Sequence, residues 1–306
     1  MTEGRFIVAV ASRALFDLEA EHAVFEREGA EAYGRLQAER EDDPLAPGPA
    51  FGLVDGLARI NAAAPDPALP LVDVVVVTRN APTSGLRVLN AVQAHGLGAT
   101  RAAMTGGRPV AEVLRGLRAD LFLTRSPADG AGAAAAGVPA AVLAEGCPHQ
   151  PFDGELRLAF DGDAVLFDDA SERAYVEGGY AGWHAYEAAH AGSDLEPGPL
   201  DPFARKLSAL REAAGAAGVA LRLALVTARD GAARRRAVVS LRNRGVALDE
   251  AFFLGGLSKG DAMAGFRPHL FLDDKAHNVA AVAALAPAAL VPALGGLAPG
   301  LPAMPP

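Results

Sequence analysis

The 306-residue sequence contains a single cysteine, Cys147, and this scarcity excludes a disulfide bond within the chain. A chain without disulfides fits a reducing compartment. The N-terminal residues lack the long apolar core of a secretory signal peptide. An apolar stretch at 279–302 is broken by prolines, so we expect a helix, a short strand and a tail there instead of a membrane span. These absences predict a soluble cytoplasmic protein.

Positive charge is also scarce. The chain has 28 lysine and arginine residues against 37 aspartate and glutamate residues, which gives a formal net charge of −9 and a pI near 5.3. This balance disfavours a general nucleic-acid-binding protein. An acidic protein that binds phosphate needs a metal ion or local basic residues to offset the repulsion. We therefore expect a small-molecule partner, and neither a nucleic-acid polymer nor a membrane.

Apolar residues are abundant, at 51% of the chain, which predicts a large folded core. Short apolar runs alternate with amphipathic segments in the first half. This alternation predicts an α/β fold with a parallel, doubly wound sheet. The expected strands of the first half are 6–10, 72–78, 98–104, 119–124 and 137–143.

The second half of the chain repeats landmarks of the first half in the same order, about 150 residues later. We therefore predict two Rossmann-like parallel-sheet units in tandem, with domains at 1–150 and 151–306. The alternative is that two doubly wound units look alike without duplication. The matching pairs are ALFD at 14–17 and VLFD at 165–168, PGP at 47–49 and PGP at 197–199, Thr78 and Thr227, Gly106-Gly107 and Gly255-Gly256, and LFLT at 121–124 and LFLD at 270–273.

The run from Leu156 to Phe160 ends in Asp161-Gly162-Asp163, which predicts a buried strand followed directly by two carboxylates. Ligands of open α/β sheets bind at this end of the strands, and a glycine lets the backbone approach them closely. Two neighbouring carboxylates repel unless a cation or a proton intervenes, so we expect one bound Mg²⁺ ion. The alternative is a surface turn with solvated aspartates.

Three later segments carry polar groups after predicted strands. Thr227 ends LRLALVT, where a hydroxyl and free backbone N–H groups form an anion site, or where the threonine caps a helix. Lys259 lies in GGLSKGD and could contact a phosphoryl oxygen or face solvent. Asp273-Asp274 ends HLFLDD, and two acids after an apolar strand are good metal ligands.

The first copy lacks this chemistry except for the threonine. We predict that it is catalytically silent and serves packing, oligomerisation or part of a substrate pocket. The residues opposite Asp161, Asp163, Lys259, Asp273 and Asp274 are Val10, Ser12, Val110, Thr124 and Arg125.

In order, the four motifs resemble the haloacid dehalogenase superfamily of phosphohydrolases, whose pattern is D-x-D, then T, then K, then D-D. The segments AVASRALFDL, PGPAF, MTGG, AFDGDAVLF, LVTAR and FLDD further resemble the cytosolic 5′-nucleotidase I family. The likeness runs over nearly the whole chain, from Phe6 to Val291. It implies a catalytic second half and Mg²⁺-dependent hydrolysis of nucleoside 5′-monophosphates, AMP foremost, to nucleoside and phosphate.

The resemblance also implies roles for the aspartates. Asp161 would be the nucleophile that forms an aspartyl-phosphate, and Asp163 would protonate the leaving oxygen and then activate water. Asp161, the backbone carbonyl of Asp163, and Asp273 would hold Mg²⁺, with Asp274 supporting it directly or through water.

By the same resemblance, Thr227, the N–H of Ala228 and Lys259 would stabilise charge on the transferring phosphoryl group. An insert near 169–196 would form a small helical cap over the site. It contains the only tryptophan and three of the four tyrosines. Trp183 and Tyr186 could stack on a base there, or could pack the cap itself.

In the first copy, Ser12 and Arg13 could contact a ribose or a phosphate, but we expect them to cap a helix. Two other functions stay open for the whole chain. One is a related phosphatase of another small phosphomonoester, such as a sugar phosphate, and the other is a non-catalytic nucleotide sensor. Water or an alcohol could accept the phosphoryl group, and a homo-oligomer could form through the silent half.

Overall fold

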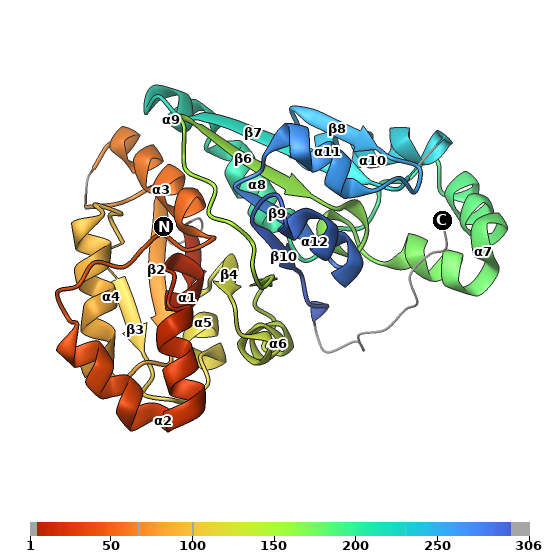
Figure 1. The fold of residues 1–306 in the computed structure, drawn as a ribbon. Helices are drawn as coiled ribbons and strands as arrows, with labels where there is room; N and C mark the ends of the chain where they lie inside the picture. Colours follow the sequence, from red (N-terminus) through yellow and green to blue (C-terminus); the bar gives the residue numbers. More distant parts are fainter. Residues whose placement is uncertain (1–4, 67, 100, 230, 295–306) are drawn as a thin grey trace.

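The computed structural model describes residues 5–66, 68–99, 101–229 and 231–294. Its strands form one ten-stranded sheet in the order β3-β2-β1-β4-β5-β10-β9-β6-β7-β8, with helices around it (Figure 1). The expected α/β class is therefore confirmed. Residues 295–302 of the expected C-terminal tail, and residue 100 of the expected strand at 98–104, lie outside the described residues.

The strands, in chain order, are β1 (Phe6–Val10), β2 (Val72–Thr78), β3 (Arg101–Met104), β4 (Leu121–Thr124), β5 (Ala140–Leu143), β6 (Glu155–Phe160), β7 (Ala220–Thr227), β8 (Glu250–Phe253), β9 (Leu270–Asp273) and β10 (Ala288–Leu290).

The helices are α1 (Ser12–Leu15), α2 (Glu19–Glu39), α3 (Phe51–Ile60), α4 (Pro82–Ala94), α5 (Ala111–Leu117), α6 (Pro127–Ala135), α7 (Ala170–Ala189), α8 (Asp201–Ala209), α9 (Arg211–Ala216), α10 (Gly231–Asn243), α11 (Lys259–Phe266) and α12 (Ala276–Ala283). A short 3₁₀ turn, η1 (Asn61–Ala63), follows α3, and a π-helical turn, η2 (Gly162–Leu166), follows β6. Among the described residues, none of these helices has the length and hydropathy to cross a membrane.

The two halves of the sheet have the same strand order. The first half reads β3-β2-β1-β4-β5 and the second, from its outer edge, reads β8-β7-β6-β9-β10. Pairing is parallel within each half, whereas β5 and β10 pair antiparallel at the centre, with Leu143 opposite Ala289. The halves are therefore related by an approximate two-fold axis between β5 and β10.

Local details of the two halves also match. A short bridge pairs Phe16 with Pro47 in the first half, and a bridge pairs Phe167 with Pro197 in the second. Each PGP turn needs its glycine, because a Cβ at Gly198 would lie 2.3 Å from the Phe167 carbonyl oxygen, with a similar clash at the first turn.

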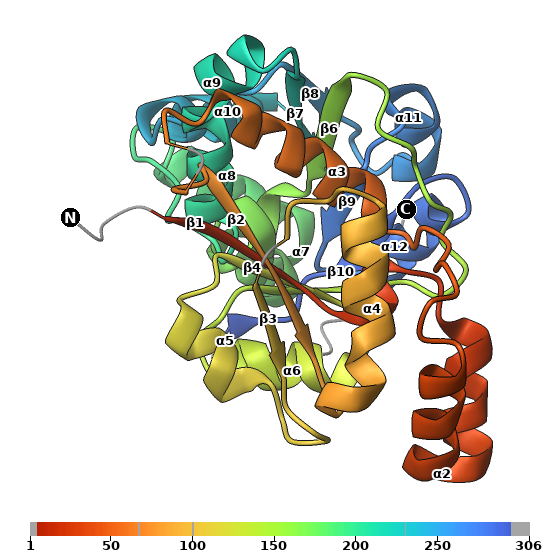
Figure 2. The same cartoon turned by 90° about the vertical axis from the view of Figure 1, so that its left-hand side faces the viewer.

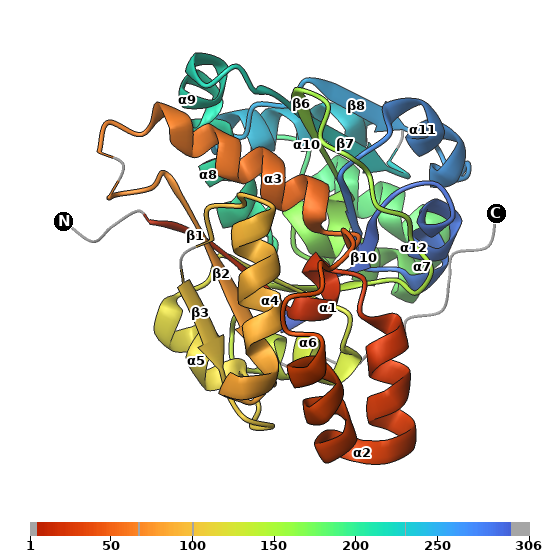
Figure 3. The same ribbon diagram turned by 60° about the vertical axis from the view of Figure 1, so that its left-hand side comes forward.

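The long helices α2 and α7 occupy equivalent places in the two halves, each after a strand and a short helical turn. Each is broken by a glycine with positive φ, Gly29 in α2 and Gly179 in α7. Figures 2 and 3 show α2 as two segments that run back on each other. Figure 1 shows α2 and α7 on opposite sides of the molecule. The segment 169–196, expected to form a helical cap, contains α7 and the loop after it, and its role as a cap stays a prediction.

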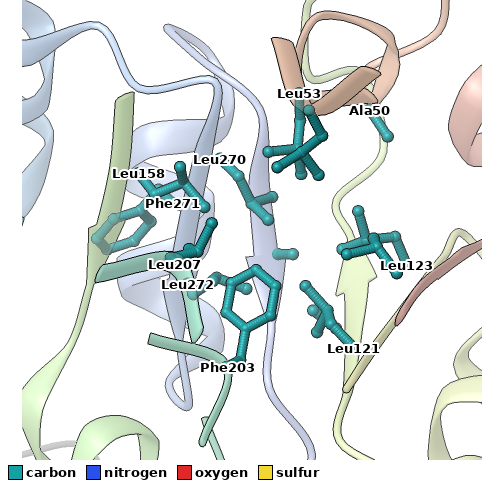
Figure 4. Close-up of a cluster of buried hydrophobic side chains, with 14 of the residues drawn as sticks. Ala50, Leu53, Leu121, Leu123, Leu158, Phe203, Leu207, Leu270, Phe271 and Leu272 are labelled. Carbon is teal, nitrogen blue, oxygen red and sulfur yellow. The ribbon is translucent and has the colours of Figure 1, made fainter. Parts of the chain in front are cut away.

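One hydrophobic core extends across both halves. Side chains from β4 and β9 meet those from α3 and α8 in this core (Figure 4). The rings of Phe6 in β1 and Phe203 in α8 lie 5.3 Å apart, which joins a strand of the first half to a helix of the second. The division into domains at 1–150 and 151–306 stays a prediction, because both the sheet and the core are continuous across it.

Candidate active site

Three neighbouring strands of the second half bring the predicted residues to one edge of the sheet. Asp161 directly follows β6, Thr227 ends β7 and Asp273 ends β9, and the order β9-β6-β7 makes these strands adjacent. The Asp161 N–H donates to the carbonyl of Leu272 at 2.8 Å, which fixes Asp161 beside the end of β9. The buried apolar strands therefore place polar groups where a ligand can meet all of them.

A carboxylate cluster forms the centre of the site. Single oxygens of Asp161, Asp273 and Asp274 lie within 4.8 Å of one another. Lys259 donates to Asp273 Oδ2 at 2.7 Å, and its Nζ lies 2.6 Å from Asp161 Oδ1. All but Asp274 are buried. Three carboxyl groups against one ammonium make a buried site for positive charge, which protons or a divalent cation could supply.

The electrostatics of these groups point the same way. Burial, together with the Asp273 charge, raises the pKa of Asp161. Burial and the charges of Asp161 and Asp273 raise the pKa of Asp274 to about 9. Burial alone would lower the pKa of Lys259, but the two carboxylates raise it, so the amine stays charged. The cluster thus has a strong affinity for positive charge, as protons or as a metal ion.

The cluster also has room for ligand bonds. The Oδ1 atom of Asp274 is buried and has no hydrogen-bond partner among the described residues. Asp273 is held from behind, because its Oδ1 accepts from the Lys275 N–H at 2.9 Å and from Asn278 Nδ2 at 3.1 Å. A hard oxygen donor set with an unpartnered buried oxygen fits Mg²⁺. These residues are the ones that could hold such an ion.

Thr227 lies against the turn that follows β6. A Cβ on Gly162 would lie 3.3 Å from Thr227 Oγ1, so glycine allows this close approach. The hydroxyl of Thr227 accepts from the Arg229 N–H at 3.2 Å, which leaves its proton to point elsewhere. Helix α10 begins at Gly231, two residues after this contact. Ala228 is exposed beside it.

The side chain of Asp163 is not part of the carboxylate cluster and pairs with Arg229 instead. Ala164 has a φ of 58°, which is a costly conformation for a residue with a Cβ, and it bends the chain within η2. Asp163 then receives two hydrogen bonds from Arg229, at 3.0 Å from Nε and 2.5 Å from an Nη atom. A metal role for Asp163 through its backbone carbonyl, which the family resemblance implied, stays a prediction; its carboxylate is bound to Arg229.

Arg229 connects Asp163 to the cap. Its side chain is only 2% exposed, and its second Nη atom lies 3.0 Å from Glu187 of α7. Glu187 also accepts from Ser171 at 2.7 Å and from Arg236 of α10 at 3.1 Å. The cap is thus held to the site by a buried network of charges.

The two aromatic residues singled out in the cap contact other cap and helix groups. Trp183 donates from its indole N–H to Ser171 Oγ at 3.0 Å. The ring of Tyr186 lies 4.2 Å from that of His190, and the Arg236 guanidinium lies 5.7 Å from the Tyr186 centroid. These contacts are those of cap packing, and base stacking by Trp183 or Tyr186 stays a prediction.

A family model described as 5′-nucleotidase matches residues 1–295 of the chain. The chain belongs to the 5′-nucleotidase family. Human cytosolic 5′-nucleotidase 1B is 34% identical to it over 281 residues, which is 89% of this chain and 46% of the human protein. The chain therefore spans less than half the length of that relative. No solved structure matches the chain. The resemblance noted from the motifs is confirmed at the level of the family.

Within this 5′-nucleotidase family site, two residues were not anticipated. Asn278 lies in the first turn of α12, where its side-chain amide donates to Asp273. Arg229 is the last residue of the segment LVTAR. Its position two residues after a strand-ending threonine was the available signal, but the sequence did not show that Asp163, 66 residues earlier, is its partner.

Proposed function

We propose that the chain is a Mg²⁺-dependent 5′-nucleotidase that acts through an aspartyl-phosphate. The observation that carries this proposal is the buried contact of Lys259 with both Asp161 and Asp273, next to Asp274. It pairs a candidate nucleophile with a fixed positive charge and a metal-type donor set. AMP is the first substrate to test, because the family resemblance implies it.

The proposed chemistry gives each of these side chains a role. An oxygen of Asp161 attacks phosphorus, the bond from phosphorus to O5′ breaks, and the nucleoside leaves with a proton from Asp163. Water then attacks the phosphoryl group, Asp163 takes back a proton, and phosphate leaves with Asp161 restored. Lys259 and Thr227 offset charge on the transferring group. Asp161, Asp273 and Asp274 would hold Mg²⁺, which would supply further positive charge next to the transferring group.

Arg229 holds the carboxylate of Asp163 through two hydrogen bonds. We propose that this contact positions Asp163 for both proton transfers, and that the ion pair of Arg229 with Glu187 links the position of Asp163 to α7.

The residues of the site define a phosphatase reaction, but they do not by themselves select a nucleotide as the substrate. The same carboxylates, threonine and lysine would serve a phosphatase of sugar phosphates. The family match and the aromatic cap favour a nucleoside 5′-monophosphate. A non-catalytic sensor is disfavoured, because Asp161, Asp163, Lys259 and Asp273 are all present and three of them are in contact. The likeness to a relative named as cytosolic supports a cytoplasmic location.

The deciding experiment measures phosphate release from nucleoside 5′-monophosphates and from sugar phosphates, with Mg²⁺ and with EDTA. We expect metal-dependent release that is fastest from a nucleoside monophosphate, and none from Asp161→Asn. A preference for a sugar phosphate would keep the mechanism and refute the nucleotidase assignment. Phosphate release that persists in EDTA would refute the dependence on a metal ion. No release from any substrate would favour a non-catalytic nucleotide sensor.

A further inference from the structure

The first half contains a large cavity of about 1110 Å³ at the carboxyl ends of β1, β2 and β4. By the internal repeat, this is the position that the active site occupies in the second half. A cavity of this size can hold a nucleotide-sized ligand. Its walls come from the same elements as those around the carboxylate cluster, with α2 in the place of the cap α7.

The floor of the cavity keeps the threonine arrangement of the active site. Thr78 ends β2, and its Oγ1 accepts from the Asn80 N–H at 3.3 Å, as Thr227 does from Arg229. Ser12, expected from the sequence to cap a helix, instead lies with its Oγ 3.2 Å from Thr78 Oγ1, and no side chain caps α1. That expectation was wrong, because the chain turns Ser12 toward the neighbouring strand. Two buried hydroxyls therefore line the floor.

The charge of this floor is opposite to that of the active site. In the place of Asp273 and Asp274 the first half has Thr124 and Arg125, and the Arg125 side chain is 9% exposed. Arg13 and Arg125 share one carboxylate, that of Glu19, at 2.7 Å and 3.1 Å.

Two guanidinium groups against one carboxylate leave one positive charge at the end of the strands. The second half has an excess of negative charge there, which calls for a cation. Of the other charged residues in the lining, Arg79 and Asp129 pair at 2.6 Å. The remaining acids, Asp17, Glu26 and Glu145, are exposed, where water and salt screen them. The floor thus fits an anion without a metal ion.

The wall formed by α2 is aromatic. Phe25 is 45% exposed, stacks on His22 with ring centroids 6.0 Å apart and an interplanar angle of 11°, and meets Tyr33 edge-on at 6.0 Å. An exposed ring at the edge of a cavity is a stacking surface for a flat ligand.

Three polar atoms of the lining residues are buried and have no hydrogen-bond partner among the described residues. They are Nδ2 of Asn80, Nε2 of His149 and Oδ1 of Asp129, of which the last lies in the ion pair with Arg79. The Asn80 carbonyl oxygen already accepts from the Tyr33 hydroxyl at 3.3 Å, which fixes the orientation of the amide. Buried groups without partners are uncommon in folded proteins, and a base edge or a ribose would satisfy them.

We propose that the first half is a second, metal-independent binding site for a nucleotide. The phosphate lies against Ser12, Thr78 and the guanidinium groups of Arg13 and Arg125, and the base stacks on Phe25. Ala11, and not Val10 as the sequence spacing predicted, stands where the second half has Asp161, because its N–H donates to Leu123 as that of Asp161 donates to Leu272. This site therefore has no nucleophile and binds its ligand without hydrolysis. The proposal does not depend on the activity of the second half.

The test is calorimetric titration of the full chain in EDTA with nucleoside 5′-monophosphates, with adenosine and with inorganic phosphate. EDTA prevents turnover and leaves the carboxylate cluster repelling anions. We expect saturable binding of one nucleotide per chain, with adenosine and phosphate each binding more weakly because each has one half of the ligand. Binding that appears only with Mg²⁺ would overturn the proposal.

Matched variants place the ligand in one half or the other. Arg125→Met should weaken nucleotide binding in EDTA by about ten-fold, the size of a lost charge-assisted hydrogen bond, whereas Lys259→Met should leave it unchanged. Phe25→Ala changes only an exposed ring, so folding is preserved, and it should weaken nucleotide but not phosphate binding. Binding that is lost in Lys259→Met, or is unchanged in both Arg125→Met and Phe25→Ala, would refute a site in the first half. Equal binding of phosphate and nucleotide would refute the base contact.

Discussion

Arg229 and Asp163 form a two-point ion pair across 66 residues of sequence, with contacts of 3.0 Å and 2.5 Å. The pair lies between the strand that carries Asp161 and the cap, because the same guanidinium reaches Glu187 in α7. Burial alone would lower the pKa of Arg229, but the charges of Asp163 and Glu187 raise it, so the guanidinium stays charged. The position of the candidate acid and base is thereby linked to the position of the cap.

Arg229→Lys should lower kcat by about 100-fold with little change in KM, since a lysine keeps the charge but cannot make the two-point contact that holds Asp163. The matched control is Arg236→Lys, because Arg236 contacts Glu187 but not Asp163. That variant should lower Tm and leave kcat near wild type. Steady-state kinetics and thermal melts measure both, and an equal fall in kcat for the two variants would contradict the role of Arg229.

Asp161→Asn should reduce turnover by about four orders of magnitude or more, because the amide cannot act as the nucleophile. The side chain is nearly isosteric, so circular dichroism should show an intact fold. Phosphate release under saturating AMP and Mg²⁺ measures the loss. Turnover near wild type would remove Asp161 as the nucleophile.

Asp274→Asn should raise Tm in EDTA and shrink the increase in Tm that Mg²⁺ produces. The first effect follows because the raised pKa of Asp274, about 9, means that folding at neutral pH must add a proton to this carboxylate, a cost that the amide of asparagine does not have. The second follows because a ligand stabilises in proportion to its affinity for the folded state.

The control for Asp274→Asn is Asp168→Asn, a carboxylate of the same half outside the cluster. Its Mg²⁺-dependent shift in Tm should equal that of the wild type. Thermal melts with and without Mg²⁺ measure both variants. If Asp274→Asn and wild type gain the same stability from Mg²⁺, Asp274 takes no part in metal binding.

Trp183→Ala distinguishes base stacking from cap packing. If the indole contacts the base, KM for AMP rises while KM for ribose 5-phosphate stays constant, because only AMP has a base to stack. We expect this split, and the same split for Tyr186→Ala. Loss of the Trp183 contact to Ser171 would instead change both substrates equally and lower Tm. Equal changes in KM would assign both rings to packing.

The burial of the His269 ring predicts that the protein loses stability in mild acid. Its ring is fully buried, its Nδ1 accepts from the Arg157 N–H at 3.1 Å, and its Nε2 lies 3.1 Å from the Pro151 carbonyl. Burial lowers the pKa of His269, and the Arg157 charge adds to this, whereas the Pro151 carbonyl and the carboxylates of Asp153 and Glu155 oppose it. As the pH falls below about 6.5, the imidazole of His269 takes up a proton in the unfolded chain but stays neutral in the folded chain. The free energy of unfolding therefore falls in this range.

Urea unfolding at about pH 7.5 and about pH 5.5 measures this effect. The wild type should lose more free energy of unfolding between these values than His269→Gln. His184→Gln, which changes an exposed histidine of the cap, should behave as the wild type. An equal loss in His269→Gln and wild type would show that His269 is not the group responsible.

The sequence by itself determined the strands, and it showed that the candidate catalytic residues lie at the carboxyl ends of these strands. Buried apolar runs that end at Asp161, Thr227 and Asp273 predict strands of a parallel sheet. The carboxyl ends of parallel strands lie at the same edge of a sheet, so these residues were expected to be neighbours. The internal repeat was also visible, because PGP turns and strand-end pairs recur at a constant spacing. Lys259 was predicted for the same site, and it contacts both Asp161 and Asp273.

The tertiary structure decided what the side chains at those ends contact. The antiparallel pairing of β5 with β10 joins the halves into one sheet, and two short apolar strands do not encode their partner. The bend at Ala164 turns Asp163 to Arg229, and the turn after β1 places Ser12 against Thr78. Spacing along the chain fixes which residues end a strand. Contacts between distant side chains depend on backbone conformation and strand order, which only the folded chain sets.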